Sequence, residues 1–372
     1  MAYTNIDDPS AYFQTLLWTG NSSDGRALTN DGNSDLQPDW VWLKNRNAGY
    51  NHFLQDSSRG NTKVLSSDST AAESTFTNMV ESFDTNGFTI GFDGSQVPNF
   101  NGNTFVGWQW KANGGTTSSN TDGSINSTVQ ANQDAGFSIV TYTGNGSTAD
   151  QTIGHGLGVR ANAVIVKNRD AAANWVVWSE GVDANHCLEL NTSDGISDST
   201  QGRVLSNAGS RGTSTIFSIR SGSGSVIQTN TSGEDYVAYC FASKQGYSKF
   251  GKYIGNGHSG GDGTFVYTGF APRFVMIKRT DGANDWILHD YKLGTLASTG
   301  SEKGNVGNVN SAALRANETS TTDDWGSIDM LSNGFKARSD AASVNASGGS
   351  YIYMAFAEHP FTTSTGIPTT AR

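Results

Sequence analysis

The sequence predicts an all-β protein made of three tandem β-sandwich domains, and three observations lead to this prediction. The 372-residue chain is rich in turn formers, including 45 glycines. Its apolar runs are short and use β-branched and aromatic residues, as in 137–142 (FSIVTY), which is typical of strands. The third observation is a set of markers that returns three times in the same order.

The central marker is an apolar strand that ends in lysine. It occurs at 41–44 (VWLK), 164–167 (VIVK) and 275–278 (VMIK). An aromatic residue followed by x-Gly-Asn precedes the lysine by 26, 25 and 25 positions, starting at Trp18, Tyr142 and Tyr253. An aromatic-rich strand follows it at 105–110, 236–241 and 351–356. The period of about 110–130 residues far exceeds that of solenoids, so each copy is large enough to form its own core.

We therefore expect an internal repeat of jelly-roll or concanavalin-like sandwiches, flanked and joined by polar segments. Segment 113–135 is rich in Gly, Ser, Thr and Asn and is predicted to be a linker, because it offers little apolar surface to bury. The predicted segments are an N-terminal arm (1–12), repeat 1 (13–112), the linker (113–135), repeat 2 (136–245), repeat 3 (246–360) and a C-terminal tail (361–372).

The lysine-ended strand is apolar on both of its faces. Val41 and Leu43 alternate with Trp40 and Trp42, so we expect a central strand that is covered on both sides. The lysine is expected where the chain returns to solvent, and the polar turn after it is expected to be exposed. Tryptophans at repeated strand positions are predicted to be core residues: Trp40, Trp42, Trp108, Trp110, Trp175, Trp178 and Trp286.

Charge and composition argue against several classes of partner. A formal charge of -10 with only 24 Lys and Arg predicts no nucleic-acid binding. The N-terminus lacks the basic and apolar segments of a signal peptide, and no apolar run approaches the length of a membrane span. Cys187 and Cys240 are expected to be buried thiols, with a disulfide between them as the alternative.

The sequence contains no spacing that predicts catalysis. It lacks the E-x-D-x-x-E pattern of paired carboxylates and the H-x-H and H-E-x-x-H patterns of metal ligands. We therefore expect no catalytic residue, no metal and no cofactor, and we interpret the Asp-Gly pairs as turns. Loops at one end of a sandwich commonly carry binding. The candidate ligand-binding residues are accordingly those at the tips of the turns after the lysine, namely Arg46, Tyr50, Arg169 and Asn174.

Several segments resemble a domain family of virion structural proteins from marine tailed phages, including fibre-like, host-facing proteins. The resemblance is strongest in 3–14, 38–46 (PDWVWLKNR), 105–112 (FVGWQWKA), 142–146 (YTGNG) and 164–175 (VIVKNRDAAANW). Repeat 3 departs from it, with Arg279-Thr280 where the other repeats have Asn-Arg. The resemblance implies a virion protein that is made in the host cytoplasm without a signal peptide.

Our leading hypothesis is a non-enzymatic tail fibre or other fibre-like appendage that contributes to host attachment. The first domain and its arm would contact other virion proteins, and the later domains would reach a host-surface glycan or protein. By analogy with fibres, we expect a homo-oligomer, specifically a trimer. Two alternatives are a capsid decoration or tail adaptor protein that contacts only virion proteins, and a polysaccharide depolymerase.

Overall fold

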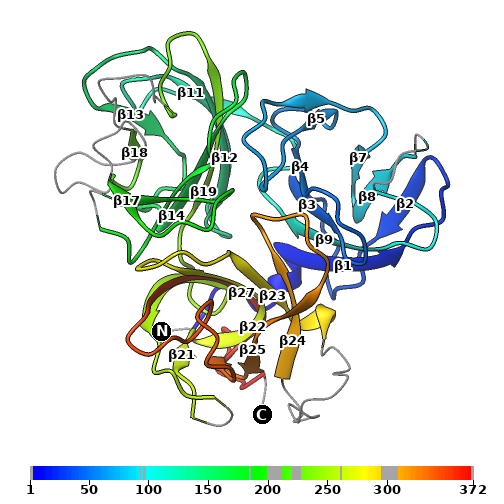
Figure 1. Ribbon diagram of the computed structural model, residues 1–372. Helices are drawn as coiled ribbons and strands as arrows, with labels where there is room; N and C mark the ends of the chain where they lie inside the picture. Colours follow the sequence, from blue (N-terminus) through cyan, green and yellow to red (C-terminus); the bar gives the residue numbers. More distant parts are fainter. Residues whose placement is uncertain are drawn as a thin grey trace.

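The computed structural model describes residues 3–92, 94, 98–183, 186–198, 212–219, 228–259, 262–294 and 309–369. Within these residues the protein is all-β, with short 3-10 turns at Pro9–Ala11 (η1) and Tyr291–Leu293 (η3). The strands form three lobes around a common centre (Figure 1). Lobe 1 comprises strands β1 to β9, lobe 2 comprises β10 to β19, and lobe 3 comprises β20 to β27.

Lobe 1 contains two main antiparallel sheets and a small one. Their strand orders are β1-β9-β3-β4, β2-β8-β7 and β5-β6. The strands are β1 (Phe13–Thr19), β2 (Arg26–Thr29), β3 (Trp40–Asn45), β4 (Phe53–Asp56), β5 (Lys63–Val64), β6 (Ser74–Thr75), β7 (Val80–Asp84), β8 (Gly87–Ile90) and β9 (Thr104–Trp110). The two main sheets enclose a local core that includes Trp18, Val41, Leu43 and Phe88.

Lobe 2 has an eight-stranded sheet in the order β10-β11-β12-β19-β14-β15-β16-β17 and a two-stranded sheet, β13-β18. Its strands are β10 (Ser118–Asn120), β11 (Ser127–Asn132), β12 (Phe137–Thr143), β13 (Gln151–Gly154), β14 (Ala163–Asn168), β15 (Val176–Ser179), β16 (His186–Glu189), β17 (Ser197–Asp198), β18 (Ile216–Ile219) and β19 (Asp235–Phe241).

Lobe 3 is a single eight-stranded sheet in the order β20-β27-β22-β23-β24-β25-β26-β21. It curls into a nearly closed barrel, and its core includes Val275, Ile277, Phe335 and Tyr353. Its strands are β20 (Ser248–Ile254), β21 (Phe265–Tyr267), β22 (Phe270–Arg279), β23 (Ile287–Asp290), β24 (Val309–Arg315), β25 (Asp323–Leu331), β26 (Gly334–Ala337) and β27 (Ser350–Pro360).

The same four-strand arrangement occurs in each lobe. The orders are β1-β9-β3-β4, β12-β19-β14-β15 and β20-β27-β22-β23. In each, the lysine-ended strand pairs with the last strand of the lobe in the same antiparallel register, with Lys44 opposite Val106, Lys167 opposite Val237 and Lys278 opposite Ile352. The recurring sequence markers therefore occupy matching positions in the three sheets.

The lysine-ended strand of lobe 1 is covered on both faces, as predicted. Val41 and Leu43 face the core of lobe 1, whereas Trp40 and Trp42 belong to a central core that the three lobes share. The Trp40 ring stacks on Tyr239 of lobe 2, with centroids 4.2 Å apart. The second face is therefore covered by neighbouring lobes, where we had expected the other sheet of a self-contained sandwich.

Aromatic residues from all three lobes meet in this central core. Phe356 of lobe 3 has its ring centroid 5.7 Å from Trp110 of lobe 1 and 6.0 Å from Phe241 of lobe 2. All the tryptophans predicted to be core residues are buried. Because large aromatic side chains bury the most apolar area, these contacts contribute strongly to holding the lobes together.

The segments outside the repeats also pack against the lobes. The stretch predicted to be a linker contains β10 and β11, and β11 pairs with β12 in the lobe 2 sheet. The N-terminal arm lies against lobe 3, where the Tyr3 hydroxyl donates to the carbonyl of Gly269 (2.5 Å), and Ile6 enters the central core. Tyr12 packs edge-on against Tyr247. β10 pairs with the other side of β11 and forms the edge of the sheet, so part of the predicted linker belongs to the lobe 2 sheet.

Cys187 and Cys240 are buried thiols that form no disulfide, which confirms the first of the two interpretations for them. In the part of the chain that the structure describes, no helix has both the length and the apolar surface needed to cross a bilayer.

Candidate functional site

The three recurring lysines lie at the boundaries between lobes. Each Nζ donates a hydrogen bond to a backbone carbonyl of another lobe: Lys44 to Thr319 (2.9 Å), Lys167 to Thr70 (3.1 Å) and Lys278 to Ser193 (3.0 Å). All three side chains are fully buried. The expectation that the lysine marks a return to solvent is therefore wrong, because the chain of the neighbouring lobe covers it.

Burial also changes the acid–base properties of these lysines. Loss of hydration disfavours the ammonium form and lowers the pKa of all three to about 8. Carbonyl oxygens replace part of the lost hydration, since Lys44 also donates to Tyr50 (2.7 Å) and Lys278 to Asn284 (2.7 Å). The ammonium groups thus connect the hairpin turn of one lobe to a loop of the next.

The residue eight positions after each lysine makes a second contact across the same boundary. A ring nitrogen lies within hydrogen-bond distance of a carbonyl oxygen in each case: His52 Nε2 to Arg315 (2.8 Å), Trp175 Nε1 to Ser66 (2.8 Å) and Trp286 Nε1 to Glu189 (2.9 Å). Since Trp42 Nε1 donates to His52 Nδ1 (2.8 Å), the His52 proton resides on Nε2, which donates as the indoles do.

A backbone hydrogen bond completes each boundary. The carbonyl two residues after the lysine accepts from an N–H of the neighbouring lobe: Arg46 from Thr322 (2.8 Å), Arg169 from Glu73 (2.7 Å) and Thr280 from Ile196 (2.8 Å). In these contacts lobe 1 reaches lobe 3, lobe 2 reaches lobe 1, and lobe 3 reaches lobe 2. Such head-to-tail contacts close a ring of three lobes.

The aromatic-x-Gly-Asn marker forms a second recurring structure, inside each lobe. Its asparagine pairs with a buried asparagine near the start of the last strand, and the second asparagine donates from Nδ2 to the first: Asn99 to Asn21 (2.9 Å), Asn230 to Asn145 (3.0 Å) and Asn345 to Asn256 (3.1 Å). The marker's aromatic side chain donates to the backbone carbonyl of the residue just before that second asparagine: Trp18 to Pro98, Tyr142 to Thr229 and Tyr253 to Val344.

The glycine of this marker is required because its loop lies against the backbone of the segment that carries the second asparagine. A Cβ at Gly144 would lie 2.2 Å from the carbonyl oxygen of Thr231, and one at Gly20 would lie 2.1 Å from that of Phe100. Only glycine permits the loop to approach this closely. The marker is therefore explained by packing.

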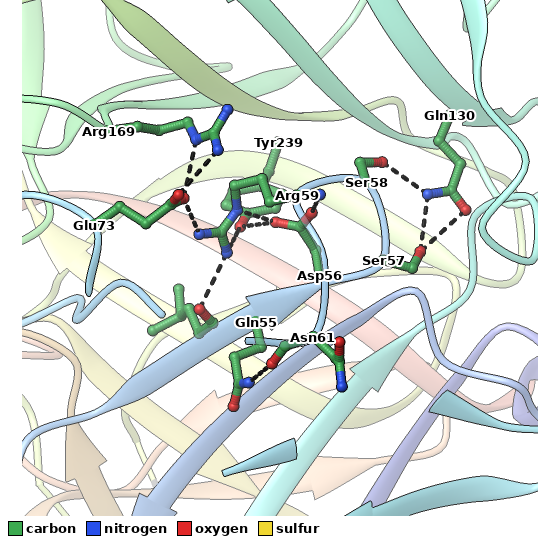
Figure 2. Close-up of polar contacts among 11 residues, drawn as sticks. Gln55, Asp56, Ser57, Ser58, Arg59, Asn61, Glu73, Gln130, Arg169 and Tyr239 are labelled. Carbon is green, nitrogen blue, oxygen red and sulfur yellow. Dashed lines mark hydrogen bonds and ion pairs between the residues drawn. The ribbon is translucent and has the colours of Figure 1, made fainter. Parts of the chain in front are cut away.

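A buried charged network joins lobe 1 to lobe 2 (Figure 2). Arg59 contacts Asp56 (2.5 Å) and Glu73 (2.8 Å), and Arg169 of lobe 2 reaches the same Glu73 (2.9 Å). Tyr239 donates from its hydroxyl to Asp56 (2.7 Å). Burial acts to raise the pKa of Glu73, but hydrogen bonds from Arg169 and the charge of Arg59 outweigh burial and lower this pKa.

A related contact lies between lobe 3 and lobe 1. Asp290, like Asp56, stands twelve residues after a recurring lysine. It accepts hydrogen bonds from Thr15 Oγ1 (2.6 Å) and Trp108 Nε1 (3.1 Å) of lobe 1. Burial raises its pKa despite the nearby charge of Arg273. In lobe 2 the matching position is a serine, Ser179.

The structure separates the four residues predicted to bind a ligand. Arg46 and Tyr50 lie at the boundary between lobes 3 and 1, where their carbonyls accept from Thr322 and Lys44. Arg169 pairs with Glu73 at the boundary between lobes 1 and 2. The Asn174 side chain accepts from Asn191 within lobe 2 (2.8 Å). Their role in ligand binding stays a prediction, and the turns that carry Arg46 and Arg169 lie against another lobe.

Two adjoining hollows open near the boundary between lobes 3 and 1. The walls of the first come from both lobes, and those of the second come from lobe 3 and the C-terminal tail. The first, of about 310 Å³, has mostly polar walls and is lined by Asp8, Ser10, Phe13, Gln14, Thr15, Asp31, Gly32, Asn33, Arg273, Lys292, Ala357, Glu358 and His359. The second, of about 220 Å³, has mostly apolar walls and is lined by Ala271, Pro272, Tyr291, Met330, Leu331, Ser332, Glu358, His359 and Thr369. A third, on lobe 2, is a shallow polar hollow of about 300 Å³ beside Arg169.

Sequence reasoning did not identify Asp56, Arg59, Glu73, Arg273 or Asp290. Asp56 and Asp290 each stand twelve residues after a recurring lysine, and this spacing could have pointed to them. Lobe 2 has Ser179 at the same spacing, so the aspartate does not recur in all three lobes. Among the described residues, no group of three or more His, Cys, Asp or Glu side chains is placed to hold a metal ion.

A family model matches the chain from residue 8 to residue 360. The match begins just before η1 and ends with β27, so it covers all three lobes. No curated protein and no solved structure matches the chain. The chain therefore belongs to the family described as "Domain of unknown function (DUF7483)".

Proposed function

We propose that the three lobes are copies of one repeated β unit and that the protein is a non-enzymatic structural component of a phage virion. In this proposal it is a tail fibre or other fibre-like appendage that contributes to host attachment. The virion assignment rests on the resemblance of its sequence segments to phage structural proteins.

The observation that carries the structural role is the recurrence of the boundary contacts. The buried lysine, the ring nitrogen eight residues later and the backbone hydrogen bond occur at all three boundaries. The side chains that a catalytic site would use at these repeated positions are hydrogen-bonded to neighbouring lobes. Such an arrangement favours mechanical integrity, which a virion component needs.

The ring of lobes changes how attachment is expected to work. Three sandwiches in a string would anchor at one end and bind at the other. Here the arm of lobe 1 lies against lobe 3, so we expect the virion-facing and host-facing surfaces to be different faces of one ring. A homo-oligomer, specifically a trimer by analogy with fibres, remains part of the proposal, and sedimentation of the purified protein tests it.

The direct test is mass spectrometry of purified particles, followed by antibody labelling in electron micrographs. The proposal expects the protein in the particle and the label on the tail. Absence from purified particles would refute it. Label on the head, or failure of the purified protein to compete for adsorption to host cells, would favour the decoration or adaptor alternative. New reducing ends from host polysaccharide would establish a depolymerase.

A further inference from the structure

Two hollows adjoin near the boundary between lobes 3 and 1, because Glu358 and His359 line both, and we refer to the pair as the groove. These residues end strand β27, where the barrel of lobe 3 meets the loop after β2 of lobe 1. The first hollow alone is at the lower limit of ligand pockets in proteins, which range from about 300 to 1,000 Å³.

The polar part of the groove presents both donors and acceptors. Arg273 of β22 pairs with Glu358, and Lys292 of η3 pairs with Asp31 of lobe 1. Arg273 is buried, and its Nε lies 3.6 Å from a carboxylate oxygen of Asp290, so its guanidinium group is held between Asp290 and Glu358.

The apolar part adjoins this polar part. Pro272, Met330 and Leu331 form a wall beside Tyr291, a residue that is 41% exposed. Sugar rings have one face of C–H groups that packs on aromatic rings and a rim of hydroxyls that needs donors and acceptors. The groove offers both kinds of contact side by side.

The boundary between lobes 1 and 2 provides an internal comparison. Asp39 there stands five residues before its lysine, as Arg273 does in lobe 3, and its carboxylate accepts from the backbone N–H groups of Ala112, Gly114 and Gly115. Gln130 of β11 fills the space beside it and bonds to Ser58 (2.8 Å). Gln130 thus fills the space beside Asp39 at the boundary between lobes 1 and 2, whereas a hollow lies beside Arg273 at the boundary between lobes 3 and 1. A ligand could occupy that hollow.

We propose that this groove binds a neutral oligosaccharide. Tyr291 would stack on a sugar ring, and Glu358, Asp31 and Arg273 would bond to its hydroxyls. The carboxylates of Asp8, Asp31 and Glu358 outnumber the cations of Arg273 and Lys292 in the polar hollow, which disfavours acidic sugars. That the groove binds an oligosaccharide does not depend on the proposed function. That this oligosaccharide belongs to the host receptor rests on the proposed function.

The test is isothermal titration of the purified full-length protein with maltohexaose, cellohexaose and laminarihexaose, and with hexagalacturonic acid as the acidic comparison. We expect at least one neutral probe to bind, and Tyr291→Ala and Glu358→Gln each to weaken binding roughly tenfold. Tyr267→Ala is the matched control, because Tyr267 is also an exposed tyrosine of lobe 3, at 50%, and does not line the groove. Unchanged melting temperatures would show that the variants fold.

Three results would overturn the inference. They are no binding of any neutral probe, tighter binding of the acidic probe, and equal losses in Tyr291→Ala and Tyr267→Ala. The two proposals fail separately. A protein that competes for host adsorption but binds no neutral probe removes the groove assignment only. A protein that binds a neutral probe but is absent from purified particles removes the virion assignment only.

Discussion

Replacing Arg59 with methionine tests whether the buried network holds lobes 1 and 2 together. Arg59→Met keeps most of the side-chain volume and removes the charge that faces Asp56 and Glu73, while Glu73 retains Arg169. Asp56 is left fully buried with the Tyr239 hydroxyl as its remaining side-chain partner. Breaking a buried ion pair on one side typically lowers stability by about 3–5 kcal/mol, and we expect a loss in this range.

The matched control is Arg160→Met. Arg160 pairs with Glu180 at 2.8 Å, but both side chains are about one-third exposed, at 38% and 32%. Exposed pairs contribute about 0–1 kcal/mol, so this change should be small. Urea unfolding followed by tryptophan fluorescence measures both variants, because the core tryptophans report on packing.

A double variant sharpens the test. Adding Asp56→Asn to Arg59→Met removes the carboxylate that the single change leaves uncompensated, so the double variant should be more stable than Arg59→Met alone. If Arg59→Met lowers the free energy of unfolding no more than Arg160→Met, or if the added change destabilises further, the network does not have the role described here.

Three further predictions concern pH and packing. Burial lowers the pKa of Lys167 to about 8 from 10.5, so the unfolded chain binds more protons above about pH 8. Wild type should therefore gain stability relative to Lys167→Met as pH rises from about 8 to about 10.5, as measured by urea midpoints. Burial lowers the pKa of His289 to about 4 from 6.5. The folded protein keeps His289 neutral, so its stability falls as pH drops from about 6.5 to about 4. His289→Gln should reduce this loss of stability in acid, as thermal melts at several pH values would show. Gly144→Ala should lower stability by about 1–3 kcal/mol in urea unfolding, because the new Cβ overlaps the Thr231 carbonyl. Gly49→Ala, with its nearest atom at 3.6 Å, should change it little.

The strand pattern was predictable because apolar periodicity depends on local sequence. Val41 and Leu43 alternate with Trp40 and Trp42, and the structure covers both faces. Periodicity cannot say what covers a face, however. The second face packs on Tyr239 and other residues of neighbouring lobes, and that contact depends on how the lobes are arranged.

The lysines were misinterpreted because a charged side chain at a strand end is usually solvated. Lys44 is buried because a loop of lobe 3, 275 residues later in the chain, supplies a carbonyl. The sequence shows that His52, Trp175 and Trp286 each stand eight residues after a recurring lysine. It does not show that all three use a ring N–H to bind a carbonyl of a neighbouring lobe, because histidine and tryptophan are different residue types.

The groove could not be predicted from sequence. Asp31 and Lys292, which meet across it, are 261 positions apart. Arg273 and Asp39 each stand five residues before a recurring lysine but carry opposite charges, so the recurring markers give no consistent signal there. The groove forms at a position where the residues of lobes 1 and 3 differ, so the recurring sequence markers do not predict it.

Lysine acylation of the native protein, mapped by mass spectrometry, tests the central claim that the recurring lysines are sealed between lobes. A pKa of about 8 would make Lys44, Lys167 and Lys278 unusually reactive toward an acylating reagent if solvent reached them. The account predicts that all three stay unmodified while the exposed Lys252 reacts, and that all four react in denaturant. Modification of the three lysines in the folded protein at the rate of Lys252 would contradict it.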